Sequence, residues 1–242
     1  MMSYNLTRAL DVLPHMIETD MVDGFTSILK FGTNSDVDNV AEEDVWSVGG
    51  TLEPLSVAET LTVSSTESFD ILITGVNSDW DLVTETLTLN GVDDVITSNE
   101  FIGVITAQVS PESPSVNTVD ITGTSTISDS IQFQILAEYG QTEMTHFIVP
   151  KDHTAFMYSA TVTSSRNDNA RVRFQQAVEG ITYITKASFE TNEAPTALNF
   201  NSFPVSFEEK SRIRTRAKAT TNNTSVTAVY QILLVKNELL EL

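Results

Sequence analysis

Residues 30–51 have the sequence KFGTNSDVDNVAEEDVWSVGGT, and this stretch differs from the rest of the chain. Elsewhere Val, Ile, Thr and Ser alternate, whereas here the polar and acidic side chains leave no apolar stripe at a spacing of 2 or 3.6 residues. Trp46 is one of two tryptophans, and Gly49-Gly50 permits positive φ angles. We predict an extended strap over residues 30–50, anchored by Phe31 and Trp46, that is neither an ordinary strand nor an ordinary helix and leads into a β-rich body.

The order of residues in the strap resembles the start of a group of small structural proteins from tailed bacteriophages, many of them marine. The shared pattern is K-F-G-x-N-x-D-V-D from Lys30, a short acidic spacer, and E-D-V-W-x-x-G-G from Glu43. The similarity continues in the family's order through the segments 59–65, 85–91, 97–101, 140–142 and 149–151. One departure is that a glycine-rich insertion after Ser64-Ser65 is replaced here by residues 66–70. The resemblance implies a β-rich virion component and fixes no position within the particle.

Composition sets limits on the class of protein. The 242 residues are 40% hydrophobic, which is enough to bury one large core or two small ones. No window approaches 18 apolar residues, so we expect no membrane span, and the N-terminus lacks the pattern of a secretory signal. With no cysteine there are no disulfides and no thiolate metal sites.

The net charge of −20 is unevenly distributed. Residues 1–150 hold two bases, Arg8 and Lys30, against 24 acids, a net charge of −22, whereas residues 151–242 hold 11 bases and 9 acids, a net charge of +2. An acidic first part disfavours duplex nucleic acid there, because backbone phosphates require Lys and Arg. Two interpretations remain: a solvated acidic surface, or an acidic part that meets the basic part of a neighbouring subunit.

Strand patterns dominate the chain after residue 50. Alternating runs such as Leu82–Leu89 and Phe101–Val109 predict strands, and Asn90-Gly91 predicts a two-residue hairpin. No helical period separates the runs, which favours antiparallel sandwiches over βαβ units. We therefore predict an all-β protein of two jelly-roll-like β-sandwich bodies. The predicted domains are an arm and strap over residues 1–50, in which residues 1–29 form a short helix or loose arm, a first sandwich over 51–128 and a second over 129–242.

No catalytic constellation can be built from these residues. None of His15, His146 and His153 lies in a known nucleophile or zinc motif, so a structural role is expected for each. Neighbouring carboxylates such as Asp36 and Asp38 fit turns better than a glycosidase cleft, since aromatics are few and scattered. The stretch from Asp36 begins like an EF-hand loop but has Val40 at a ligand position, which leaves only a non-standard calcium site open. We predict no enzyme activity, no cofactor and no metal.

A row of cations near the end is the most distinctive local feature. Alternation places five of them on one face of a strand of roughly 27 Å, and they are Lys210, Arg212, Arg214, Arg216 and Lys218. Arg171 and Arg173 repeat the device on an earlier strand. The cation row could be a solvated edge that opposes aggregation, an interface with acidic surface on the same or a neighbouring chain, or a nucleic-acid contact. The absence of interleaved aromatics disfavours the last, so we predict no nucleic-acid partner.

These observations lead to one functional hypothesis with a rival. We expect a non-enzymatic phage virion protein, assembled in the host cytoplasm, that decorates, cements or projects from the head or neck. It would dock on other virion subunits through strap residues Phe31, Asp36, Asp38 and Trp46 and through the cation row. We also expect a homo-oligomer, with a trimer as the leading arrangement. The rival hypothesis is a tail fibre or host-binding tail component.

Overall fold

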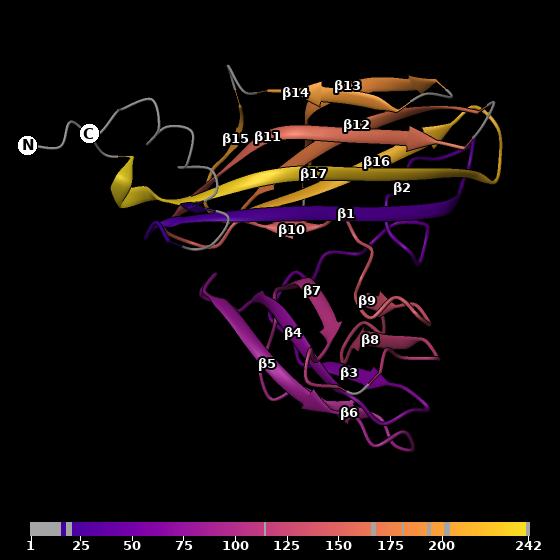
Figure 1. Cartoon of the computed structure of the whole chain (residues 1–242), viewed down its shortest axis with the longest axis vertical. Coiled ribbons are helices and arrows are strands. Elements are labelled where there is room, and N and C mark those ends of the chain that lie inside the picture. The colour runs from indigo at the N-terminus through magenta and orange to yellow at the C-terminus, as the bar shows by residue number, and fades with distance from the viewer. Residues whose placement is uncertain are drawn as a thin grey trace, which may run out of the picture.

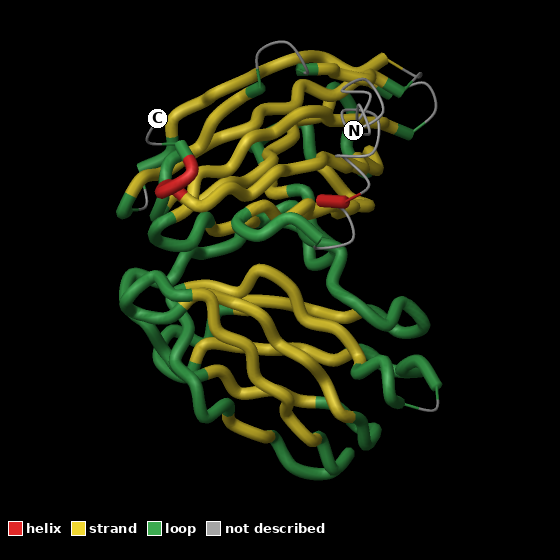
Figure 2. The backbone as a smooth tube through the Cα atoms, turned by 60° about the vertical axis from the view of Figure 1, so that its left-hand side comes forward, coloured by secondary structure: helices red, strands yellow, loops and turns green. Residues whose placement is uncertain are grey.

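The structure is a computed structural model that describes residues 16–17, 21–113, 115–165, 168–180, 182–192, 195–200 and 204–240. Two β-rich bodies stand one above the other (Figure 1). Turning the molecule shows the same two bodies, each made of strands, with loops running between them (Figure 2). No helix in the described part of the chain is long and apolar enough to cross a membrane.

The second body, the upper one in Figure 1, consists of two antiparallel sheets. Sheet A contains, in spatial order, β1 (Phe25–Val37), β17 (Thr224–Lys236), β11 (His153–Ser164) and β14 (Thr196–Asn199), and β15 (Val205–Phe207) also pairs with β11. Sheet B contains β10 (Phe147–Ile148), β16 (Ser211–Ala219), β12 (Asn169–Val178) and β13 (Ile184–Asn192), and β2 (Glu43–Asp44) also pairs with β16. A 3₁₀ turn, η1 (Asn237–Leu239), follows β17.

The first body also consists of two antiparallel sheets. One contains β6 (Val95–Ile96), β3 (Leu61–Ser64), β8 (Ile121–Ser125) and β9 (Ile131–Ile135), in that spatial order. The other contains β5 (Leu82–Thr88), β4 (Asp70–Val76) and β7 (Gly103–Val109). Each body encloses a cluster of fully buried aliphatic and aromatic side chains, to which alternate strand positions contribute. The predicted fold class, all-β with two antiparallel sandwich bodies, is confirmed.

The prediction that residues 30–50 contain no ordinary strand is wrong for their first part. Residues 25–37 form β1, which pairs antiparallel with β17 along its length. Its inward positions include Lys30, Gly32 and Asn34, all buried, and Ile28 and Val37 nearer its ends pack in the core. Because a lysine, a glycine and an asparagine occupy the inner face, hydrophobic alternation cannot reveal this strand. Most of the arm predicted for residues 1–29 lies outside the described residues.

Two further sequence predictions differ from the structure. The predicted domain boundary lies between residues 128 and 129, but β9 pairs with β8 and so belongs to the first body. Asn90-Gly91 does not close a hairpin, because β5 pairs with β4 whereas β6 pairs with β3 in the other sheet. Instead the Asn90 side chain accepts the N–H groups of Val92 and Asp93, which makes this segment a loop between sheets.

Candidate functional site: the joint between the two bodies

Residues 38–52, which we call the acidic segment, lie along the edge of β16. Within the segment β2 pairs antiparallel with β16. The N–H of Val45 donates to the carbonyl of Thr215 at 2.9 Å, and the N–H of Ala219 donates to the carbonyl of Asp38 at 3.1 Å. Main-chain hydrogen bonds therefore fix the acidic segment beside the strand that carries the cation row.

Every member of the predicted cation row has a partner within the chain. The partners are Glu179 for Lys210, the carbonyls of Leu55 and Ile102 for Arg212, Gln175 for Arg214, the carbonyl of Glu42 for Arg216 and the carbonyl of Val40 for Lys218. Lys210 precedes β16 and has a φ of 55°, so it does not share the strand geometry of the other four. Arg212 is 2% exposed, so it offers no surface to another subunit.

Two carboxylates of the acidic segment face arginines of sheet B, on β12 and on β16. Glu42 lies 2.9 Å from Arg173 and 3.5 Å from Arg171, both on β12. One Asp44 oxygen lies 3.8 and 3.9 Å from Nε of Arg216 and Arg214. The Glu42 and Asp44 side chains are 16% and 6% exposed, so solvent screens these pairs much less than surface ion pairs. Among the described residues, acidic and basic parts thus meet inside one chain, and the contact that we expected between subunits at this strand is intramolecular.

Hydrogen bonds of the Asn34 and Glu43 side chains fix the conformation of the acidic segment. The Asn34 side-chain amide donates to the Glu43 carboxylate at 3.0 Å and to the carbonyl of Asp44 at 3.1 Å, while its oxygen accepts the N–H of Asp36 at 2.9 Å. The Glu43 carboxylate also accepts the N–H of Gly50 at 3.1 Å. These residues are therefore specified by local hydrogen bonding.

Gly32 permits the close approach of the same segment. A Cβ atom at Gly32 would lie 2.6 Å from the carbonyl oxygen of Val45 and 2.9 Å from the backbone nitrogen of Thr145, closer than a side chain allows. Gly49 and Gly50 have φ angles of 75° and 64°, in the left-handed region that favours glycine. The three glycines of the shared pattern are thus required by backbone geometry.

Consecutive residues of the acidic segment enter the cores of different bodies. Val45 is fully buried in the second-body cluster, and Trp46, 4% exposed, lies in the first-body cluster. The Trp46 Nε1–H donates to the carbonyl of Gly49 at 2.7 Å. The prediction that Trp46 anchors the strap to another subunit is therefore wrong, because the side chain is already buried in its own chain. The acidic segment joins the two bodies, and we call the region it spans the joint.

Cations of the second body also bind carbonyls of the first. Lys30 Nζ donates to the carbonyl of Ile105 in β7 at 2.6 Å, and Arg212 donates to the carbonyls of Leu55 and Ile102 at 2.7 and 3.2 Å. The guanidinium of Arg212 also lies 5.7 Å from the centre of the Trp80 ring. Both tryptophans of the chain are therefore at the joint.

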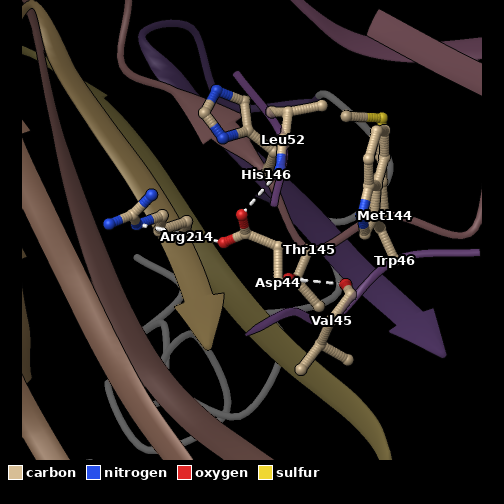
Figure 3. Close-up of a pocket in the computed structure, with 8 residues that line it drawn as sticks. All are labelled: Asp44, Val45, Trp46, Leu52, Met144, Thr145, His146 and Arg214. Atoms are coloured by element: carbon tan, nitrogen blue, oxygen red, sulfur yellow. Dashed lines mark hydrogen bonds and ion pairs between the residues drawn. The ribbon is translucent and has the colours of Figure 1, made fainter. Parts of the chain in front are cut away.

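A small cavity lies where these elements meet, and Figure 3 shows its lining. Asp44 accepts the N–H of Leu52 at 2.8 Å with one oxygen and points the other toward Arg214. That second oxygen and Nδ1 of the adjacent His146 are buried without a hydrogen-bond partner. The cavity volume is about 10 Å³, which is room for about one water molecule. A substrate does not fit this site.

Burial shifts three ionisable groups at the joint. Burial raises the pKa of Asp44 to about 6, although the nearby Arg214 and Arg216 oppose the shift. Burial lowers the pKa of Lys30 to about 7. Burial also lowers the pKa of His146 to about 3, with Arg212, Lys30 and Arg214 adding to the effect. His146 is therefore neutral at pH 7, in line with the structural role expected for it.

The remaining predicted docking residues lie at the surface. Phe31 is half-buried on the outer side of sheet A, Asp36 is exposed, and Asp38 is partly exposed at the start of the acidic segment. In the part of the chain that the structure describes, no group of three or more His, Cys, Asp or Glu side chains could hold a metal ion.

Sequence reasoning missed Lys30, Asn34 and His146 as residues of the joint. Lys30 gave one signal that could have been used, because it is one of only two bases in the first 150 residues. Its partner is a backbone carbonyl 75 residues away, which no sequence pattern indicates.

No family model and no curated protein matches the chain. Solved structures of infectious bursal disease virus show a weak similarity. The crystal structure of the VP2 subviral particle is 9% identical over 97% of this chain and 78% of that one, with a TM-score of 0.22. The Gx strain structure is 8% identical over 93% of this chain and 80% of that one, also with a TM-score of 0.22. The structure of the T=1 particles is 8% identical over 93% and 75%, with a TM-score of 0.21. Similarity at this level carries no argument about function.

Proposed function

We propose that this chain is a non-enzymatic structural protein of a virus particle, and specifically a head or neck accessory protein of a tailed bacteriophage. It decorates, cements or projects from the particle by docking on neighbouring virion subunits. The observation that carries the proposal is the order of residues in the strap, K-F-G-x-N-x-D-V-D followed by E-D-V-W-x-x-G-G, which resembles small phage structural proteins.

The structure gives this pattern a physical purpose that suits an architectural protein. Lys30, Gly32, Asn34, Glu43 and Trp46 each bind or pack within the joint. A sequence pattern that fixes two sandwiches against each other suits a protein with a structural role. The cavity at the joint has room for about one water molecule, which supports a mechanical role there in preference to catalysis.

Docking would use surface that the joint leaves free. Phe31 and Asp36 remain available on β1, and Arg171, with a side-chain exposure of 46%, remains partly available beside Glu42. Trp46 and Arg212 drop out of the docking set because they are buried within the chain.

The test is to locate the protein in purified particles. Mass spectrometry of gradient-purified virions should find it in stoichiometric amounts, and particle reconstruction should show two adjoining sandwich-shaped densities on the head or neck. Density on the tail, together with binding of the purified protein to host cells, would support the tail-fibre hypothesis instead. Absence from particles, or release of reducing ends from host polysaccharide by the purified protein, would refute the proposal.

A further inference from the structure

The outer side of sheet A carries a second feature, separate from the joint. Strand register aligns five positions on each of β1, β17 and β11 in rows across the outer side of the sheet; most of them are partly exposed, and Val235 is buried. The rows are Phe25–Val235–Thr154, Ser27–Leu233–Phe156, Leu29–Gln231–Ser159, Phe31–Val229–Thr161 and Thr33–Thr227–Thr163. We call these fifteen positions the neutral face. In Figure 1 the three strands lie side by side.

The composition of the neutral face is unusual for this chain. None of its fifteen residues is charged, although 19% of the chain is charged and the net charge is −20. Three phenylalanines, two leucines and two valines occupy a side of the sheet that is normally polar when it faces water. Leu29 is 63% exposed. Depletion of charge with enrichment of aromatic residues is the compositional mark of an interface core.

The neighbouring strands extend the neutral face without adding charge. Ala197 and Asn199 of β14 pair with Thr161 and Ser159, and Ser206 of β15 pairs with Phe156. By contrast, the outward positions of sheet B carry arginines and Lys218. The second body thus has one cationic face, already engaged by the acidic segment, and one uncharged face.

We propose that the neutral face binds the neutral face of a second copy of this chain in a two-fold symmetric pair. Two chains of net charge −20 repel each other, and contact through an uncharged face brings the fewest carboxylates together. A charged partner would find no countercharge there. A self-complementary patch that meets itself generates a closed pair, which differs from the trimer expected from sequence.

The size of the face is sufficient for such a contact. Nine residues of β1, from Phe25 to Thr33, span about 30 Å, and the sheet is four strands wide, or about 19 Å, when β14 and β15 beside β11 are counted as the fourth strand, which gives about 570 Å². Two such faces together bury about 1,100 Å², above the roughly 1,000 Å² that a specific interface requires. The sheets would pack at about 10 Å separation, as the layers of a sandwich do.

The experiment measures the mass of the full chain in solution by light scattering and sedimentation between 1 and 100 µM. The proposal predicts about 53 kDa, twice the 26.6 kDa of one chain. Leu29→Glu and Phe31→Glu should each weaken association at least about 100-fold, because the contact contains each position twice and burying an unpaired charge is costly. The matched control is Val40→Glu, which adds the same charge at a site that is 77% exposed and off this face, and it should leave the pair intact.

Salt separates this contact from one driven by charge. Raising NaCl from 0.1 to 1 M screens the repulsion between the two acidic chains and should tighten the pair, whereas a contact between opposite charges would weaken. Circular dichroism checks that each variant remains folded, as expected for outward positions. A 27 kDa species at 100 µM, a mass other than that of a pair, or an assembly indifferent to both Leu29→Glu and Phe31→Glu would overturn the proposal. Each of these results would leave the virion role untouched, since that role rests on the joint pattern and on particle localisation.

Discussion

Trp46→Ala is the substitution that most clearly separates a core residue from a docking residue. In the structure the indole is 4% exposed within the first-body core, and its Nε1–H bonds to Gly49. Truncation of a buried tryptophan costs about 3–5 kcal/mol through lost burial and the cavity that remains. With a urea dependence of about 3 kcal/mol/M for a chain of this size, the unfolding midpoint should fall by about 1–1.7 M.

The assay is urea unfolding followed by circular dichroism, because the substitution removes one of the two tryptophans that a fluorescence assay would use. Trp46→Phe is the matched control. It keeps most of the apolar surface but removes the donor to Gly49, so we expect a loss of about 0.5–1.5 kcal/mol. A midpoint for Trp46→Ala within 0.2 M of the unmodified protein would show that the side chain contributes little to the fold and would return it to the role of a docking residue.

Three further substitutions test the electrostatics of the joint. The pKa of Asp44 is raised to about 6 by burial, so the stability that its protonated form contributes is fully present below the unfolded pKa of about 3.8 and is lost as pH rises through 6. Asp44→Asn should remove that loss of stability from pH-dependent urea curves. The pKa of Lys30 is lowered to about 7 by burial, so the unfolded state binds more protons than the folded state between pH 7 and 10.5, and the free energy of unfolding should rise over that range. Lys30→Met should flatten this rise. The control Lys236→Met, at an exposed ion pair, should leave the rise unchanged. Arg216→Glu should destabilise the fold by about 3–5 kcal/mol because it places a third carboxylate beside Glu42 and Asp44, and a midpoint unchanged from the unmodified protein would contradict the intramolecular pairing.

The fold class could be predicted from the sequence because most strands bury alternate apolar side chains. Ile131–Ile135 and Ser211–Ala219 show the alternation that the structure confirms as strands. The pairing of the strands could not be predicted from the sequence. β9 joins β8 in the first body, and β5 and β6 separate into different sheets, because partner choice depends on long-range packing that the local pattern does not encode.

The joint could be predicted from the sequence only in part. The strap and the cation row were each singled out by composition, but nothing in either segment shows that they meet. Glu42 and Arg216 are 174 residues apart, and the contact forms because β2 adds to the edge of β16. The strand β1 was hidden because its inner positions hold Lys30 and Asn34, whose burial is made possible by specific hydrogen-bond acceptors rather than by apolar character.

Hydrogen exchange at Val45 and Ala219 tests most directly whether the acidic segment is bound within its own chain. The Val45 N–H donates to Thr215, and the Ala219 N–H donates to Asp38, so both amides report the contact between the acidic segment and β16. The structure predicts that, at concentrations below 1 µM, both exchange as slowly as amides inside β16, and that their rates do not change with protein concentration. Exchange of both amides within seconds in the dilute protein, with protection appearing only in assembled particles, would show that the acidic segment binds a neighbouring subunit instead.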